Sequence, residues 1–338
     1  MTDWFERITG FKEADYEATR ARLAVEDGRL VSDAHDRRYA VGRLELPSLA
    51  DLRARASALL QCAARTKLRA VIGDVRALHR DPVHAGALFQ VASQFNLLEM
   101  TGPSVSPEEG VTRYMHDRTQ GPACAIAAGA ATIYRNYLVP IGSEQGQTRQ
   151  RQLDALAPLG EALSAALRRP VRSLWTMRNG YALCTPEGLA AIGDMLGRAD
   201  EATRDGLRSR LRIGLHHDVE VTDADPAQAQ FVTQAFCSAL PVAYTTIAPA
   251  IWKPFAMLVL EAAYEATLLA AAIRSAQGQP RTVFLTSLGV GAFGNDEAWI
   301  DAALERALRR VDHAGLDVAI FSHGSLRSGL HRLVERFQ

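Results

Sequence analysis

Cysteine is scarce in this chain of 338 residues, which has only four. Cys62, Cys124, Cys184 and Cys237 lie far apart and form neither a CxxC pair nor a cluster with histidines. A disulfide framework and a structural zinc site are therefore not expected. We expect the four thiols to be reduced and mostly buried.

An excess of charge of either sign is also missing, since 38 Lys and Arg stand against 38 Asp and Glu. A broad surface for nucleic acid or membrane is therefore not expected, and any anionic ligand must be held locally. No segment approaches eighteen uninterrupted apolar residues, and the N-terminus lacks the apolar run of a signal peptide. We expect a cytoplasmic protein that binds neither nucleic acid nor membrane.

What is present is a regular alternation of apolar runs and helical patterns from Lys67 onward, which predicts a layered α/β domain. Residues 1–66 read as an accessory segment with a short helix, strands at Arg29–Ser32 and Arg38–Glu45, and a helix opened by Pro47-Ser48. Residues from about 142 to 220 read as an insertion of helices and a hairpin in a domain that spans 67–338. The main elements expected in that domain are strands at 68–75, 87–95, 282–289 and 316–323, an apolar strand-and-turn run at 231–244, and helices at 123–137, 252–275 and 297–311.

The most informative segment is TVFLTSLGVGAFGNDEAW, in which a buried strand runs into a glycine-rich turn and then a helix. Gly289, Gly291 and Gly294 can adopt backbone angles closed to other residues, so successive N–H groups can turn toward one anion. The following helix is expected to add the positive end of its dipole. A plain strand-to-helix turn is the alternative, and the pattern favours phosphate binding.

The loop GVGAFGND resembles the diphosphate loop of the macrodomain superfamily, in particular its poly(ADP-ribose) glycohydrolase-like branch. The resemblance covers residues 67–141 and 231–323 and implies a three-layer fold, with a mixed sheet flanked by helices, that binds ADP-ribose. Gly73-Asp74-Val75 resembles the step whose aspartate receives the adenine amino group, and Asn96 matches an asparagine that orients the distal ribose. The implied diphosphate contacts are Gly289, Val290, Gly291, Ala292, Phe293, Gly294 and Asn295.

The segment between Asn96 and the next helix departs from that branch. Only Gly110-Val111 and Thr119-Gln120-Gly121 are similar to its catalytic loop, and Gly121-Pro122 stand where two glutamates follow the glutamine. The resemblance still implies ligand contacts at Gly110, Val111 and Gln120. The lost glutamates indicate an activity that differs from that of the poly(ADP-ribose) enzymes.

Four acids in this segment can supply the missing carboxylate chemistry. Cleavage at the anomeric carbon of ADP-ribose calls for a carboxylate that activates water and an acid for the leaving group. Asp117 is the first candidate for the general base, Glu109 is the second, and Glu99 can bind a ribose hydroxyl or receive a cationic leaving group. Glu108 is the fourth acid, and solvent exposure is the alternative for each of them.

These residues predict an ADP-ribosyl hydrolase that removes single ADP-ribose units from protein. An acid-rich pocket mouth suits a guanidinium, so arginine-linked ADP-ribose is the expected substrate. A non-catalytic reader of ADP-ribose and a hydrolase of a small ADP-ribose derivative remain alternatives. Neither a cofactor nor a metal is expected, because no cluster of metal ligands is visible.

Two further features have ordinary alternatives. Neighbouring residues on a strand face opposite sides, so His216-His217 is not expected to bind a metal. Phe293 can pack on the distal ribose or fill the core.

Overall fold

The computed structural model describes residues 2–57, 64–225, 227–322 and 327–338. A seven-stranded sheet forms its centre, in the order β4-β11-β12-β6-β13-β14-β5. The strands are β4 (Arg43–Glu45), β5 (Lys67–Ile72), β6 (Leu88–Ala92), β11 (Gly214–Glu220), β12 (Phe231–Cys237), β13 (Thr282–Thr286) and β14 (Asp317–Ser322). The strands from β12 to β5 are parallel, and β11 is antiparallel to both of its neighbours.

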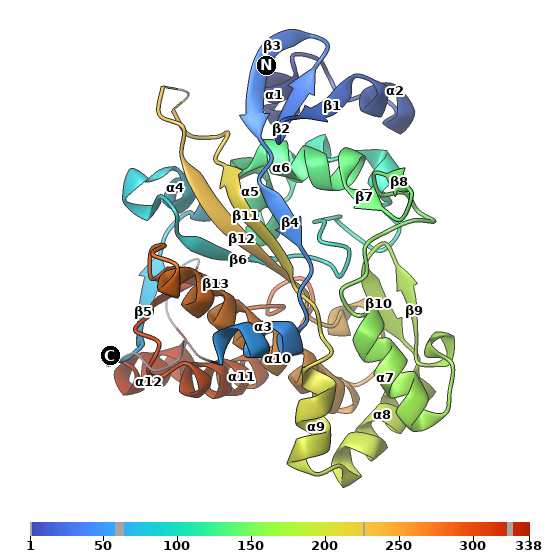
Figure 1. The fold of residues 1–338 in the computed structure, drawn as a ribbon. Helices are drawn as coiled ribbons and strands as arrows, with labels where there is room; N and C mark the ends of the chain where they lie inside the picture. Colours follow the sequence, from blue (N-terminus) through green and yellow to red (C-terminus); the bar gives the residue numbers. More distant parts are fainter. Residues whose placement is uncertain (1, 58–63, 226, 323–326) are drawn as a thin grey trace.

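Helices cover both faces of this sheet (Figure 1). One layer consists of α3 (Leu49–Ala56), α10 (Pro249–Ala276), α11 (Glu297–Arg310) and α12 (Ser328–Arg336). The other consists of α4 (Val75–Arg80), α5 (Gln120–Ala127) and α6 (Gly129–Ile133), and α6 continues into the turn Tyr134–Leu138. The predicted α/β class, with a mixed sheet between helical layers, is confirmed.

The segment before Lys67 builds on this domain. It contains α1 (Trp4–Thr9), α2 (Tyr16–Ala21), a meander of β1 (Leu23–Glu26), β2 (Arg29–Ser32) and β3 (His35–Ala40), and then β4 and α3. The strand predicted at Arg38–Glu45 is divided at Gly42, where φ is +76° and a Cβ atom would lie 2.2 Å from the His217 carbonyl oxygen. Ser48 caps α3 as predicted, with Asp51 as its reciprocal partner.

The insertion forms a lobe beside the sheet (Figure 1). It contains the short hairpin β7–β8 (Pro140–Ile141 and Glu144–Gln145), α7 (Ala157–Leu167), β9 (Trp175–Arg178), β10 (Tyr181–Cys184), α8 (Pro186–Arg198) and α9 (Glu201–Arg208). The hairpin predicted within the insertion is present, with β9 and β10 paired. Gly214–Glu220, which the prediction placed in the insertion, forms β11 of the main sheet instead.

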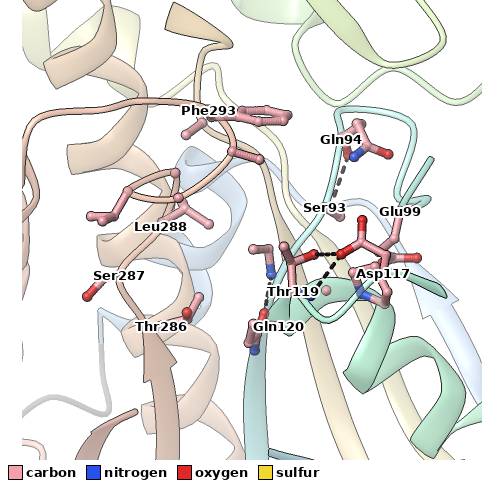
Figure 2. A pocket seen from close by; sticks show the side chains of 18 of the residues that line it. Ser93, Gln94, Glu99, Asp117, Thr119, Gln120, Thr286, Ser287, Leu288 and Phe293 are labelled. Carbon is pink, nitrogen blue, oxygen red and sulfur yellow. Dashed lines mark hydrogen bonds between the residues drawn. The ribbon is translucent and has the colours of Figure 1, made fainter. Parts of the chain in front are cut away.

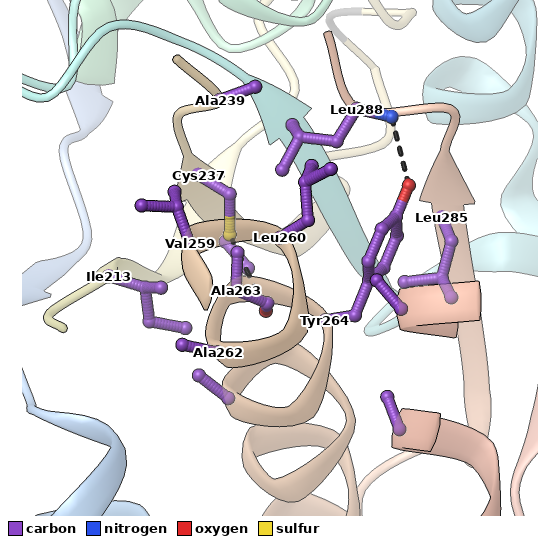
Figure 3. Packing of buried hydrophobic residues seen from close by; sticks show 14 of the residues in the cluster. Ile213, Cys237, Ala239, Val259, Leu260, Ala262, Ala263, Tyr264, Leu285 and Leu288 are labelled. Carbon is purple, nitrogen blue, oxygen red and sulfur yellow. Dashed lines mark hydrogen bonds between the residues drawn. The ribbon is translucent and has the colours of Figure 1, made fainter. Parts of the chain in front are cut away.

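The main core lies between the sheet and α10, whose side chains pack against β12 and β13 (Figure 3). By length and composition α10 could cross a membrane, but 83% of its most apolar window is buried in the protein, as expected of a core helix. Cys124, Cys184 and Cys237 are free and buried, as predicted, and Cys62 lies outside the described residues.

A second apolar cluster joins the N-terminal segment to the loop that follows β6. Trp4, Phe5 and Phe11 pack in it with Val111 and Tyr114. The N-terminal segment therefore supports the region in which the sequence places the catalytic residues.

Candidate functional site

A cavity of about 550 Å³ opens at the carboxyl ends of the parallel strands. Loops after β6, β12 and β13 line it, together with the start of α5, Phe321 of β14, Arg327 and Tyr181 of the insertion hairpin. The carboxyl ends of strands in an open α/β sheet are the usual place for a ligand. The size and position fit a nucleotide-sized molecule.

The glycine-rich loop after β13 forms one wall of this cavity, opposite the wall that carries Glu99 and Asp117 (Figure 2). Its turn is closed by Asn295 N–H, which donates to the Gly289 carbonyl at 2.9 Å, and by Gly294 N–H, which donates to Gly291 at 3.1 Å. Four backbone N–H groups make no hydrogen bond to any described residue, namely those of Gly289, Gly291, Ala292 and Phe293. All four residues line the cavity. The loop therefore offers a set of free donors suited to a phosphate.

Buried polar contacts hold this loop from below. The Tyr264 hydroxyl on α10 accepts from Leu288 N–H at 2.9 Å and donates to the Thr286 carbonyl at 2.7 Å (Figure 3). The Asn295 side chain donates to the Leu240 carbonyl at 2.8 Å and is 3% exposed. Asn295 and Gly294 thus support the loop from behind. Neither residue lines the cavity, so the structure does not place them where the predicted direct contact with the ligand would be.

The start of α11 differs from the expectation. Asp296 caps this helix by accepting from Ala298 N–H at 2.7 Å, and Glu297 follows in the first turn. Two carboxylates thus occupy the positive end of the dipole. The donors for an anion are therefore the N–H groups of the glycine loop itself. The N-terminus of α11 does not add the favourable dipole that the sequence predicts.

Three aromatic rings meet at the mouth of the loop. The Phe293 ring lies 5.2 Å from Tyr181 and 5.7 Å from Tyr244, centroid to centroid, and all three residues line the cavity. The Tyr181 hydroxyl donates to the Met100 carbonyl at 2.7 Å, which ties the insertion hairpin to the loop after β6. Phe293 therefore lines the cavity as part of an aromatic wall, and it also packs against the core.

Glu99 places a nearly buried carboxyl group on the opposite wall (Figure 2). Its side chain is 2% exposed, and neither carboxyl oxygen has a hydrogen-bond partner among the described residues. Burial raises the pKa of Glu99 to about 8, against a smaller opposing effect of the Arg135 guanidinium. Near neutral pH this group is therefore mainly protonated and can donate a proton.

Asp117 is the second carboxylate on the wall that carries Glu99. Its Oδ1 accepts from the Thr119 N–H at 2.8 Å and from the Thr119 hydroxyl at 2.7 Å, just before α5 (Figure 2). Its Oδ2 makes no hydrogen bond to the described part of the chain. These bonds fix the carboxylate in one orientation and leave an oxygen available for a water molecule.

The start of α5 is held tightly against β6. The Gln120 side chain donates to the Gln90 carbonyl at 2.7 Å and accepts from Ala92 N–H at 2.9 Å. A Cβ atom at Gly121 would lie 2.0 Å from the Ala92 carbonyl oxygen and 2.9 Å from Glu99 Cγ. The Glu99 side chain therefore occupies the space beside Gly121, where the resembling branch has a glutamate. Gln120 lines the cavity, but its amide is used to position the helix.

Glu13 of the N-terminal segment holds the middle of the segment between Asn96 and α5. Its carboxylate accepts from Val111 N–H at 2.8 Å, from Thr112 N–H at 2.7 Å and from the Tyr137 hydroxyl at 2.7 Å. Gly110 sits directly on this carboxylate with φ of +79°. Gly110 and Val111, predicted as ligand contacts, are thus structural parts of the loop and do not line the cavity.

Two other predicted site residues, Glu109 and Asn96, also lie outside the cavity. Glu109 is exposed, accepts from Ser106 N–H and pairs with Arg113 at 2.7 Å. Asn96 is fully buried, because its side chain closes the turn at Leu97, where φ is +64°.

Asp74 and Val75 lie beyond the cavity as well. The Asp74 side chain caps α4 by accepting from Arg76 N–H, and Val75 is buried in the core. The structure therefore does not bring the predicted adenine and distal-ribose contacts to the cavity.

Several cavity residues had no sequence signal. They are Ser93, Gln94, Met100, Tyr181, Tyr244, Ser287 and Arg327. Arg327 pairs with Asp301 at 3.0 Å and donates to the Ser287 hydroxyl at 3.2 Å. These positions become neighbours only through the fold, although a Ser or Gln directly after a parallel strand is a signal that could have been used.

Metal ligands do not gather in the described residues, where no group of three His, Cys, Asp or Glu side chains could hold an ion. His216 is buried with its Nδ1 3.1 Å from Arg135 Nη1, and His217 contacts Glu45 at 2.9 Å. The two rings leave β11 on opposite faces, as predicted.

Comparison with known proteins gives only distant structural likenesses. No protein-family model and no curated protein matches the chain. Poly(ADP-ribose) glycohydrolase from Deinococcus radiodurans in complex with ADP-ribose is 13% identical, with a TM-score of 0.46 over 87% of this chain and 94% of that one. The poly(ADP-ribose) glycohydrolase from Thermomonospora curvata is 14% identical, with a TM-score of 0.44 over 95% and 96%. These neighbours carry the name of the branch that the glycine loop resembles, but similarity at this level carries no argument about ligand or reaction.

Proposed function

We propose that this protein binds ADP-ribose and hydrolyses the bond between its anomeric carbon and a single attached group. The observation that carries the proposal is the loop Gly289–Phe293, in which four residues with unpaired N–H groups line a cavity that has two carboxyl groups on its opposite wall. The loop suits a diphosphate, and the aromatic wall at Phe293 suits a ribose or base.

The two carboxyl groups suit the two proton transfers of such a reaction. Asp117 takes a proton from water through its free Oδ2 as the water oxygen attacks the anomeric carbon. Glu99 gives its proton to the leaving atom as the old bond breaks. The raised pKa of Glu99 suits the acid of this reaction.

The nature of the leaving group is a separate question. The expected preference for arginine rested on four acids at the mouth, but Glu108 and Glu109 are engaged with Arg149 and Ser106 outside the cavity. Arginine-linked ADP-ribose therefore stays a prediction without support from the acid count. Removal of one unit from protein remains the proposed reaction.

A reader without catalysis is the second candidate function, favoured by the loss of the paired glutamates at Gly121-Pro122. Binding alone would need the free N–H groups of the loop but no proton donor.

The test is calorimetric titration with ADP-ribose, followed by incubation with proteins modified on arginine, glutamate or serine. Release of ADP-ribose by the wild type, lost in Asp117→Asn and Glu99→Gln, supports hydrolysis. Binding without release from any target would establish the reader. No binding of ADP-ribose would refute both candidates.

A further inference from the structure

We infer that the hairpin β9–β10 of the insertion positions the proposed proton donor Glu99, and that the hydroxyl group of Tyr181 is the decisive contact. The inference rests on the proposed function and gives the insertion a role in it. Glu99 needs such support, because neither of its carboxyl oxygens has a hydrogen-bond partner among the described residues. The position of its carboxyl group is therefore set by the backbone that carries it and by packing.

That backbone is the turn 94–100, which follows β6. Leu97 lies in it with φ of +64°, a conformation that a leucine adopts only when its surroundings hold it there. Within the turn, Gln94 N–H donates to the Leu98 carbonyl at 2.9 Å, and Leu98 N–H donates to the Asn96 side chain at 3.1 Å. These contacts are local, so the place of the turn at the cavity depends on partners from other parts of the chain.

The insertion supplies partners for the first half of the turn. Phe95 N–H donates to the Gly180 carbonyl at 3.0 Å, and the Phe95 carbonyl accepts from Ala155 N–H at 2.9 Å. The Gln147 side chain donates to the Asn96 carbonyl at 3.0 Å. Gly180, Ala155 and Gln147 all belong to the insertion, which therefore pairs the backbone of two successive residues of the turn.

Gly180, at the tip of the hairpin, also packs directly on the turn. Its φ is +79°, and a Cβ atom there would lie 2.5 Å from Asn96 Oδ1 and 2.6 Å from Gln94 Cβ. A larger residue at this position would push the hairpin and the turn apart. The hairpin and the turn are therefore in close contact as well as hydrogen-bonded.

Tyr181 holds the second half of the turn, next to Glu99. Its hydroxyl donates to the Met100 carbonyl at 2.7 Å and accepts from the Gln94 side-chain amide at 3.3 Å. The Gln94 side chain in turn accepts from Met100 N–H at 2.8 Å. These contacts are buried, since Tyr181, Gln94 and Met100 are at most 6% exposed. They fix both backbone groups of the residue that follows Glu99.

Tyr181→Phe removes the hydroxyl contacts and keeps the ring that packs with Phe293 and Tyr244. The Met100 carbonyl and the Gln94 amide then lose a buried partner, and the turn can shift. A displacement of a catalytic group by about 1 Å can lower a rate by about 10²-fold. The N–H groups of the glycine loop are not touched, so the affinity for ADP-ribose should stay within about threefold.

The experiment uses the leaving group to distinguish a displaced proton donor from a general structural defect. One substrate is ADP-ribose joined to para-nitrophenol, which leaves as a stable anion and needs no proton. The other is ADP-ribose joined to a serine or arginine side chain of a peptide, whichever the wild type cleaves faster, and its leaving atom needs a proton. Single-turnover rates on both are measured together with the affinity for ADP-ribose.

Four variants are compared with the wild type. Tyr181→Phe and Gln94→Met each remove one partner of the contact, so that the second serves should the first not fold. Glu99→Gln gives the pattern expected when the donor itself is lost. Tyr39→Phe is the matched control, because Tyr39 lies on β3 and does not line the cavity.

We expect Tyr181→Phe and Gln94→Met to lose about tenfold or more in rate on the peptide and less than about threefold on the nitrophenyl compound, as Glu99→Gln does. Tyr39→Phe should match the wild type on both substrates. An equal loss on both substrates, or no loss on either, would overturn this inference alone. A wild type that cleaves only the nitrophenyl compound would overturn the donor role of Glu99 and this inference with it. A wild type that cleaves neither substrate would overturn the proposed function as a whole.

Discussion

The substitution Glu99→Gln tests the assignment of the proton donor. Glutamine has nearly the shape of a protonated glutamate but cannot give up a proton to a leaving group. Loss of a positioned general acid lowers rates by about 10²- to 10⁴-fold. We therefore expect ADP-ribose release to fall by that factor while the affinity for ADP-ribose stays within about threefold.

The same substitution, Glu99→Gln, is expected to raise the stability of the folded protein at neutral and alkaline pH. The pKa of Glu99 rises from 4.5 to about 8 on folding, because the carboxyl group is buried. Below about pH 4.5 both the folded and the unfolded protein hold the proton, so the shift has no effect on stability. Between pH 4.5 and 8 only the unfolded state releases it, so the folded state loses stability as pH rises.

The magnitude follows from the size of the shift. At 1.36 kcal/mol per pKa unit, the shift from 4.5 to about 8 sets an upper bound of about 5 kcal/mol on the penalty at pH 8. Relaxation and the Arg135 charge reduce this, and we expect Glu99→Gln to be about 1–3 kcal/mol more stable than the wild type at pH 8. Near pH 4.5 the two proteins should be equally stable.

Urea unfolding of both proteins at pH 4.5, 6 and 8, together with single-turnover release, measures both effects. Glu161→Gln on the exposed side of α7 is the control for the chemistry of the substitution. A variant that releases ADP-ribose at the wild-type rate would refute the proton-donor role. A stability difference that does not grow with pH would refute the buried, protonated state.

Three further substitutions test other parts of the site. Gly289→Ala should lower ADP-ribose affinity at least tenfold in calorimetry and destabilise the fold by about 1–3 kcal/mol. The reason is that φ at Gly289 is +81° and the new Cβ would lie 2.5 Å from the Cβ of Ala239. Gly291→Ala is the matched control and should leave stability within about 0.5 kcal/mol, because nothing lies within 4 Å of its new Cβ. Glu13→Gln should lower kcat several-fold with little change in ADP-ribose affinity, since it weakens the clamp on the catalytic segment outside the cavity; a change in affinity alone would contradict this. Asp117→Asn should abolish most of the release at unchanged thermal stability, and a fully active variant would remove Asp117 from the mechanism.

Most of the fold could be predicted from the sequence because hydrophobic periodicity is local. The strand, glycine loop and helix from Thr282 to Arg310 lie where the pattern places them. The residues of β11 were predicted to belong to the insertion, because the sequence of a strand does not reveal the strands with which it pairs. The break at Gly42 depends on the backbone of His217, which is distant in sequence.

The site was harder to predict because its parts meet only in three dimensions. The spacing of the glycines predicts the loop, and the position before α5 predicts Asp117, and both line the cavity. Asn96 does not line the cavity, and the sequence does not show that its side chain closes a turn. Tyr181 and Glu13 reach the site from the insertion and the N-terminus, and no local pattern links them to it.

The apolar cluster shared by the N-terminal helices and the segment around Val111 has a consequence for how the protein is made. Trp4 and Phe5 leave the ribosome more than a hundred residues before their packing partners from Val111 to Leu138. Until then the aromatic side chains of the nascent N-terminus lack their native contacts. Ordering of the catalytic segment is therefore expected to be a late step in synthesis, and removal of the first forty residues should yield an aggregation-prone chain rather than a smaller active one.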